Sequence, residues 1–195
     1  MQREGDALVA LLPTEPPSGK LEYSVLLRDA TGEVRIPGGE PVLMRFKGEV
    51  PALVLIPHVV VIFFSMLIGL RAALSALLGR PETKRYAWVT LVGITLGGMI
   101  LGPIVQKYAF GAFWTGWPFG SDLTDDKTAV MWLAWIAAVA VLARRPDPRD
   151  RPARAVVALA AAVMIAVYVV PHSLRGSQLD YSKLPAASTT TGGDP

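Results

Sequence analysis

The chain has 195 residues, of which 52% are hydrophobic and 18% charged, and its formal net charge at pH 7 is +3. This composition excludes intrinsic disorder, and the absence of cysteine excludes disulfides, thiolate catalysis and cysteine-ligated metal or iron–sulfur centres. The small positive charge gives no reason to expect a nucleic-acid partner. Because the apolar residues are concentrated in long blocks, the sequence predicts a mainly α membrane protein.

Residues 1–50 show the alternation of apolar and polar residues that is typical of β-strands. It occurs in ALVALLP, in KLEYSVLLRD and in GEVRIPGGEPVLMRFKG, with turn residues between these runs. We expect a small antiparallel β-segment, a partial sandwich whose sheet lacks a covering layer. The N-terminus has no apolar signal-peptide region. Either the first span pulls this segment across the membrane, or upstream residues complete and target the domain; the second alternative is preferred.

Four apolar blocks follow, and the predicted spans cover about residues 52–70, 87–105, 128–143 and 155–171. A membrane helix needs roughly 20 apolar residues to cross the hydrocarbon core. The expected architecture is therefore a four-helix transmembrane domain over residues 51–183, with a flexible polar tail at 184–195. The alternative is a buried soluble helical bundle, but charged loops separate the blocks too cleanly for it.

The distribution of basic residues predicts the orientation of these spans, because cytoplasmic loops are enriched in lysine and arginine. Nine lysines and arginines lie in or beside the first and third connections, whereas the second has two lysines facing three aspartates. Arg45 and Lys47, just before the first span, oppose this trend but are outnumbered. We expect a bacterial inner-membrane protein with both termini extracytoplasmic.

The second span contains two small-residue patterns, Gly93-x-x-x-Gly97 and Gly98-x-x-x-Gly102. Such patterns allow helix backbones to approach closely in lipid. Packing within the bundle is favoured over a dimer interface.

The chain has two histidines, His58 and His172, and each follows a proline near the predicted outer face. Neutral imidazoles could ligate a metal or haem iron, or hydrogen-bond a quinone. A metal would also need a carboxylate, for which Asp122 is the candidate, and Gln106 is a further cofactor-binding candidate. The alternative is that both imidazoles simply bind backbone carbonyls and water.

The predicted outer loop interleaves glycines with aromatic residues. Cofactor binding is assigned to Trp114 and Trp117, and contact with a partner or lipid to Tyr108 and Phe113. The alternative is an aromatic belt at the membrane interface. At the start of the third span, either Thr124 or Asp125 is expected to cap the helix, which leaves Asp122 outside the cap.

Two basic residues at this face are also candidates for partner or lipid contact. Lys107 could pair with Asp122 or Asp126, or extend toward water, and the second outcome is favoured. Arg175 could contact an anionic headgroup or the acidic loop.

The runs LPTEPPSGKLEYSVLLRD and PVLMRFKGEVPALVLIPHV resemble a junction in an uncharacterised family of bacterial integral membrane proteins. There, an immunoglobulin-like extracytoplasmic domain leads into the first membrane helix. The segments GPIVQKYAFGAFWTGWPFGSDLTDDKT and PHSLRGSQLDYSK are similar to other signature segments of that family. The resemblance covers most of the chain and implies this architecture, but no particular reaction. Compared with that pattern, we expect this chain to begin inside the β-domain.

Enzymatic catalysis is the least favoured class, because no hydrolase, metalloprotease, P-loop or dinucleotide-binding motif is present. A transporter is disfavoured because the spans have almost no ionisable residue at mid-depth. The leading hypothesis is an accessory or structural subunit that docks through its outer face in or beside a larger membrane complex, such as an electron-transfer or photosynthetic one. The outer β-segment and the aromatic loop would form the contact surface. The alternative is a membrane redox protein that binds haem, metal or quinone through His58 and His172.

Overall fold

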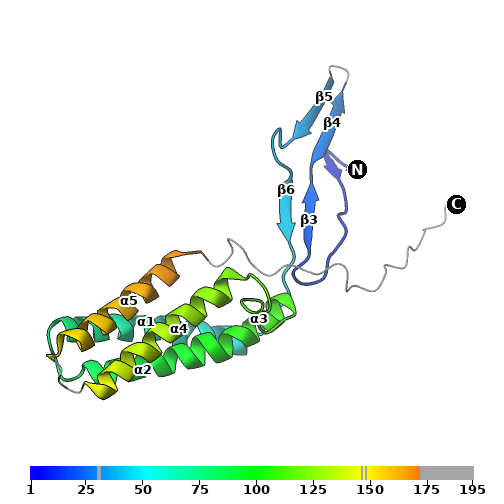
Figure 1. Cartoon of the computed structure of the whole chain (residues 1–195). Coiled ribbons are helices and arrows are strands. Elements are labelled where there is room, and N and C mark those ends of the chain that lie inside the picture. Colours follow the sequence, from blue (N-terminus) through cyan, green and yellow to red (C-terminus); the bar gives the residue numbers. More distant parts are fainter. Residues whose placement is uncertain (30–31, 146, 148, 172–195) are drawn as a thin grey trace. The chain divides into compact units, whose positions relative to one another are not determined.

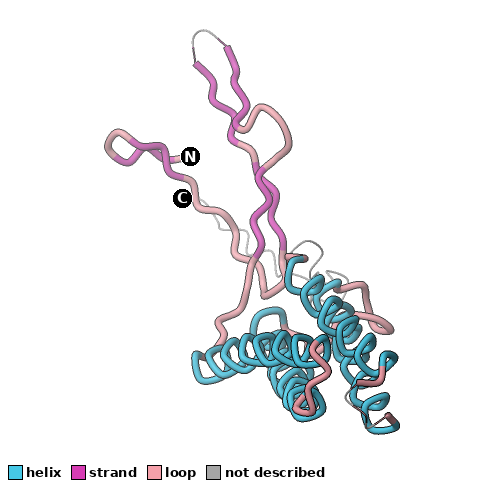
Figure 2. The backbone as a smooth tube through the Cα atoms, turned by 90° about the vertical axis from the view of Figure 1, so that its left-hand side faces the viewer, coloured by secondary structure: helices cyan, strands magenta, loops and turns pink. Residues whose placement is uncertain are grey.

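The structure is a computed structural model, which describes residues 1–29, 32–145, 147 and 149–171. These residues form two compact units, one reaching Lys47 and the other beginning at Gly48. The first unit contains the strands and the second contains the helices (Figures 1 and 2). The fold is mainly α, with small antiparallel β-hairpins at the N-terminus, as the sequence predicts.

The N-terminal unit has six short strands in three antiparallel pairs: β1 (Gln2–Glu4) with β2 (Ala7–Val9), β3 (Lys20–Tyr23) with β6 (Val42–Arg45), and β4 (Val25–Asp29) with β5 (Gly32–Ile36). The run KLEYSVLLRD reads as one strand in the sequence, but it divides at Ser24 into β3 and β4. The division arises because five residues separate β5 from β6 on the returning chain, whereas only Ser24 separates β3 from β4. The two ladders therefore cannot continue in one register.

The second unit is built from helices α1 (Ala52–Leu77), α4 (Leu123–Arg144) and α5 (Arg151–Val169), and from one interrupted helix. The interrupted helix consists of α2 (Thr83–Ile94), the π-helical segment η1 (Thr95–Leu101) and α3 (Gly102–Phe110). Helix α1 extends well beyond the predicted end of the first span at Leu70. It can do so because Arg71 lies on an exposed face, where its long side chain can reach the polar region.

Each helix of the bundle has two neighbours. Helix α1 packs against α2 and α5, and α4 packs against the same two helices. This is the arrangement expected when short connections join successive antiparallel helices. One end of the bundle therefore carries the α1–α2 and α4–α5 connections, which we call the basic end. The other carries residues 111–122, between α3 and α4, and is called the loop end.

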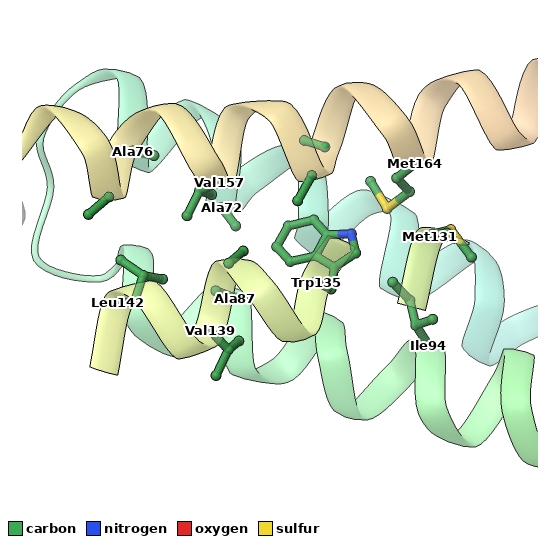
Figure 3. Close-up of a cluster of buried hydrophobic side chains, with 14 residues drawn as sticks. Ala72, Ala76, Ala87, Ile94, Met131, Trp135, Val139, Leu142, Val157 and Met164 are labelled. Carbon is green, nitrogen blue, oxygen red and sulfur yellow. The ribbon is translucent and has the colours of Figure 1, made fainter. Parts of the chain in front are cut away.

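Half of the buried hydrophobic cluster of the bundle is alanine, and its largest side chain is Trp135 (Figure 3). Trp135 of α4 is fully buried, and Ala72, Ala76 and Ala87 from α1 and α2 are also completely inaccessible. Met164 of α5 completes the centre of this cluster. Small side chains let the backbones approach closely, so that the helices associate by van der Waals contact.

The glycine patterns of the second span pack within the bundle, as predicted. A Cβ atom on Gly93 would overlap Ser65 Oγ, and one on Gly97 would lie 2.7 Å from Ile62 Cγ1, both on α1. A Cβ on Gly98 would lie 3.1 Å from Thr128 Cγ2 of α4. The second span therefore cannot approach α1 or α4 more closely, and larger residues in place of these glycines would push the helices apart.

The outer surface of the bundle is strongly apolar. Leu53, Leu67, Phe64 and Leu159 are all more than half exposed, although they are large hydrophobic residues. All four helical segments, with α2, η1 and α3 counted as one, are long and apolar enough to cross a membrane. An apolar exterior around a core of small residues is typical of membrane helices. The protein is a multi-pass membrane protein, and lipid is the natural environment of this surface.

Candidate functional site

The polar residues of the loop end are organised by the start of α4. Asp125 is buried in the first turn of this helix, and its Oδ2 accepts hydrogen bonds from the backbone N–H groups of Thr115 (2.6 Å) and Gly116 (2.9 Å). Gln106 of α3 donates to the same oxygen at 3.0 Å and to Thr115 Oγ1 at 2.7 Å. One carboxylate thus connects α3, the loop and α4. Hydrogen bonds to a charged acceptor are stronger than neutral ones, so this connection is firm.

The N-cap of α4 is Asp122, which corrects the expectation that Thr124 or Asp125 would cap this helix. Asp122 Oδ1 accepts a hydrogen bond from the backbone N–H of Thr124 at 2.8 Å. Asp125 cannot serve as the cap because it lies inside the helix, where its side chain binds the loop instead. Asp122 is therefore buried and occupied in a structural role.

The third carboxylate, Asp126, holds the tip of the loop. Its Oδ1 accepts a hydrogen bond from the backbone N–H of Trp117 at 2.6 Å. The loop also approaches α4 very closely at Gly116, where a Cβ atom would lie 2.5 Å from that same Oδ1. Only glycine fits at this position, so the loop backbone lies directly on the first turn of α4.

Lysines at the loop end bind backbone carbonyls. Lys107 Nζ donates to the carbonyl of Gly111 at 2.6 Å and lies 5.6 Å from the centre of the Phe113 ring. Lys107 therefore does not pair with Asp122 or Asp126. It lies on the exposed surface, where its ammonium group caps the end of α3. Lys127 is buried and donates to the carbonyl of Val170 at 2.6 Å, at the end of α5.

The aromatic side chains of the loop are largely exposed, whereas its polar groups are held in hydrogen bonds. Phe113, Trp117 and Phe119 are 56%, 77% and 82% exposed. Trp114 is partly buried and donates from Nε1 to the carbonyl of Trp117 at 3.1 Å, while Tyr108 on α3 is exposed. A loop backbone held by the carboxylates of Asp125 and Asp126 therefore displays large apolar rings at its surface.

His58 is partly buried on α1 and contacts the π-helical segment. Its Nδ1 lies 2.9 Å from the carbonyl oxygen of Gly97, which also accepts the backbone N–H of Gly102. Because a carbonyl only accepts, the proton of the neutral ring is on Nδ1, and Nε2 is left as an acceptor. His172 and Arg175 lie outside the described residues. Within the described part of the chain, no three histidine or acidic side chains are grouped closely enough to hold a metal ion.

At the basic end, an arginine of α5 binds the C-terminus of α1. Arg154 of α5 donates from Nε to the carbonyl of Ala76 at 2.7 Å and from Nη2 to that of Leu77 at 2.5 Å. In the connection before α5, Arg145 and Asp150 form an ion pair at 3.1 Å. Arg154 therefore satisfies terminal carbonyls of α1 in addition to contributing positive charge.

The sequence alone did not indicate the role of Asp125 as the centre of the loop end, or those of Thr115 and Lys127. Helical spacing places Asp125 on an inward face only if the start of α4 is known, and the predicted span began five residues too late. For the tandem glycines at 97 and 98, the sequence predicts only a packing role. They also lie in the π-helical segment, for which no sequence signal was recognised.

No family model, no curated protein and no solved structure matches the chain. What the structure supports of the family resemblance is architectural: four long apolar helical segments follow a small N-terminal β region.

Proposed function

We propose that this protein is an accessory or structural subunit of the bacterial inner membrane, which docks in or beside a larger membrane complex through its loop end. The observation that carries the proposal is the contrast between the two kinds of side chain there. The carboxylates are occupied by backbone N–H groups, whereas Phe113, Trp117 and Phe119 point outward on a firmly held backbone. Exposed aromatic rings on a preorganised loop contribute much of the binding energy at protein interfaces.

The same proposal includes the orientation and the division of the chain. Nine basic residues lie at or near the basic end, and the positive-inside rule places such an end in the cytoplasm. The loop end and both termini are then extracytoplasmic. The β-segment (1–50), the transmembrane domain (51–183) and the tail (184–195) remain the proposed domains. The electron-transfer or photosynthetic nature of the complex is part of the proposal.

A photocrosslinking experiment tests the docking surface. A benzophenone amino acid replaces Trp117 in the full chain, and a matched variant carries it at Leu159, which is 64% exposed in the middle of α5. After irradiation of intact membranes, we expect a discrete protein adduct from position 117 and lipid adducts from position 159. Identical lipid adducts at both positions would contradict the proposal and leave the aromatic residues as an interfacial belt.

A second candidate is a redox protein that binds haem, a metal or a quinone. The hydrogen bond from His58 Nδ1 to the Gly97 carbonyl is the contact expected of a histidine with a purely structural role, but it also leaves Nε2 as an acceptor, and metal-ligating histidines commonly donate their other ring N–H to a carbonyl. His172 is proposed as the second ligand. The absorbance spectrum and metal content of the purified protein distinguish the candidates. A Soret band or stoichiometric metal that is lost in His58→Ala favours the redox protein, and its absence from the wild type favours the accessory subunit.

A further inference from the structure

Two exposed stripes run along neighbouring helices, and each has an arginine at the basic end. On α1, residues spaced three and four apart form the first stripe: Phe64, Leu67 and Arg71. On α2, the same spacing forms the second stripe: Arg85, Val89 and Val92. Residues at these spacings lie on one face of a helix. Each stripe therefore combines a cation near the membrane surface with apolar side chains that extend toward the hydrocarbon core.

The two arginine ends lie at the same level of the bundle. The Arg71 guanidinium is 5.1 Å from the centre of the Tyr86 ring, and Tyr86 adjoins Arg85 in α2. Arg71 Nη1 also donates to Ser75 Oγ at 3.0 Å. These contacts restrict Arg71 to the junction of α1 and α2, although its side chain is exposed. A guanidinium held in this way loses less conformational entropy when it binds an anion.

Arg85 has no side-chain ion pair or hydrogen bond to any residue that the structure describes. The acidic residue Glu82 lies nearby in the chain, at the N-cap of α2, and the other described acids of the basic end, Asp147 and Asp150, belong to the α4–α5 connection. Asp150 is already paired with Arg145. On the described part of this face, Arg71 and Arg85 form no ion pair, and Glu82 is the one acid near them in the chain, three residues before Arg85. The α1–α2 face thus keeps a net positive charge that favours an anion from outside the bundle.

We propose that the Arg71–Arg85 face binds an anionic phospholipid, with its phosphate between the two guanidinium groups and its acyl chains along the two stripes. A nucleic acid or an acidic protein would match the arginines but would leave Phe64, Leu67, Val89 and Val92 without a partner. A phospholipid matches both parts of the surface. This site lies at the opposite end of the bundle from the proposed docking loop and does not depend on it.

The test compares anionic and zwitterionic lipid on the full chain in a neutral detergent. Bound phosphatidylglycerol and phosphatidylcholine are counted by native mass spectrometry over a lipid titration at low salt. Two arginines near a membrane surface both favour an anionic headgroup, so we expect phosphatidylglycerol to bind about thirtyfold more tightly. Equal binding of the two lipids would overturn the proposal, as would displacement of the lipid by millimolar inorganic phosphate.

Three variants locate the site. Arg71→Gln with Arg85→Gln should abolish the preference, whereas the matched control, Arg80→Gln with Arg149→Gln, removes the same charge from the same end and should preserve it. Because Arg71 also joins α1 to α2, its replacement can disturb the fold as well as the lipid site. The single variant Arg85→Gln therefore tests lipid binding without this effect. It removes no described side-chain hydrogen bond or ion pair and should lower the preference about fivefold. An equal loss in the control pair, or an unchanged preference in Arg85→Gln, would contradict a specific lipid site.

Discussion

At the scale of single residues, the loop end depends most on Asp125, which the sequence indicates only as a candidate helix cap. Its carboxylate satisfies two backbone N–H groups of the loop and the amide of Gln106. A buried donor that loses its acceptor costs much more than the net value of the hydrogen bond. The order of the loop, and the display of its aromatic rings, should therefore respond strongly to this residue.

We expect Asp125→Ala to lower the free energy of unfolding by about 3 kcal/mol, because three donors lose their acceptor together. Asp126→Ala is the matched control, since it removes a neighbouring carboxylate with one backbone partner, and it should cost about 1 kcal/mol. Unfolding by a denaturing detergent in mixed micelles measures both values. If the two variants are equally stable, Asp125 is not the centre of the loop end.

The candidate residues of this end could be predicted from composition, but their roles could not. Tyr108, Phe113 and Trp117 are exposed, whereas the N-cap of α4 is Asp122 and not Thr124 or Asp125 as predicted. The reason is physical: capping depends on which residue is the last with extended backbone, and Asp122 has ψ near 108°. Local sequence allowed all three choices, and the contact between the loop and α4 selected one.

At the scale of elements, the close approach of α1 and α2 is set by glycine. Gly93 lies against Ser65, whereas a Cβ atom on Gly102 would come no closer than 3.5 Å to a neighbouring atom, an ordinary contact distance. The same substitution at these two positions should thus have different effects. A methyl group added at a tight helix–helix contact forces the two backbones apart. Where there is room, alanine in place of glycine stabilises the helix.

Gly93→Ala should lower stability by about 1–3 kcal/mol, because its methyl group would overlap Ser65 Oγ. Gly102→Ala, in the same membrane span, serves as the control and should be neutral or slightly stabilising. Thermal unfolding followed by circular dichroism in detergent compares the two. A neutral Gly93→Ala would show that α1 and α2 can separate without cost.

At the scale of the whole molecule, both ends of the bundle are joined by cations that satisfy helix C-termini. Arg154 binds the last carbonyls of α1 at the basic end, and Lys127 binds the end of α5 at the loop end. Positive charge at a helix C-terminus complements the helix dipole. Part of the charge that the sequence offers as an orientation signal is therefore also structural.

The proposed orientation predicts which end can be labelled from outside the cell. Because the chain has no cysteine, Ser121→Cys in the loop and Arg149→Cys in the α4–α5 connection each provide a unique thiol at an exposed site. A membrane-impermeant maleimide should label the Ser121→Cys variant in intact cells. It should label the Arg149→Cys variant only after the cells are permeabilised. The reverse pattern would invert the proposed topology.

The helical unit should fold without the strands. Its buried hydrophobic cluster comes entirely from bundle helices, and the backbone N–H of Gly48 donates to Ala109 within the same unit. A chain beginning at residue 48 should keep its helical circular dichroism and most of its thermal stability in detergent. The isolated segment 1–47 should remain largely unfolded, since pairs of short strands are marginal in water. Loss of helix in the shorter chain would contradict this independence.

The π-helical segment has a consequence for the rotational phase of the second span. A residue accommodated in a wider turn shifts everything after it by about 100° relative to a continuous α-helix. Before the segment, Gly93 faces α1; after it, Gln106 meets Asp125 at the start of α4. One helix thereby serves two differently directed contacts. Deleting a single residue between 95 and 101 would leave the span long enough to cross the membrane, yet it would turn Gln106 away from the carboxylate that organises the loop.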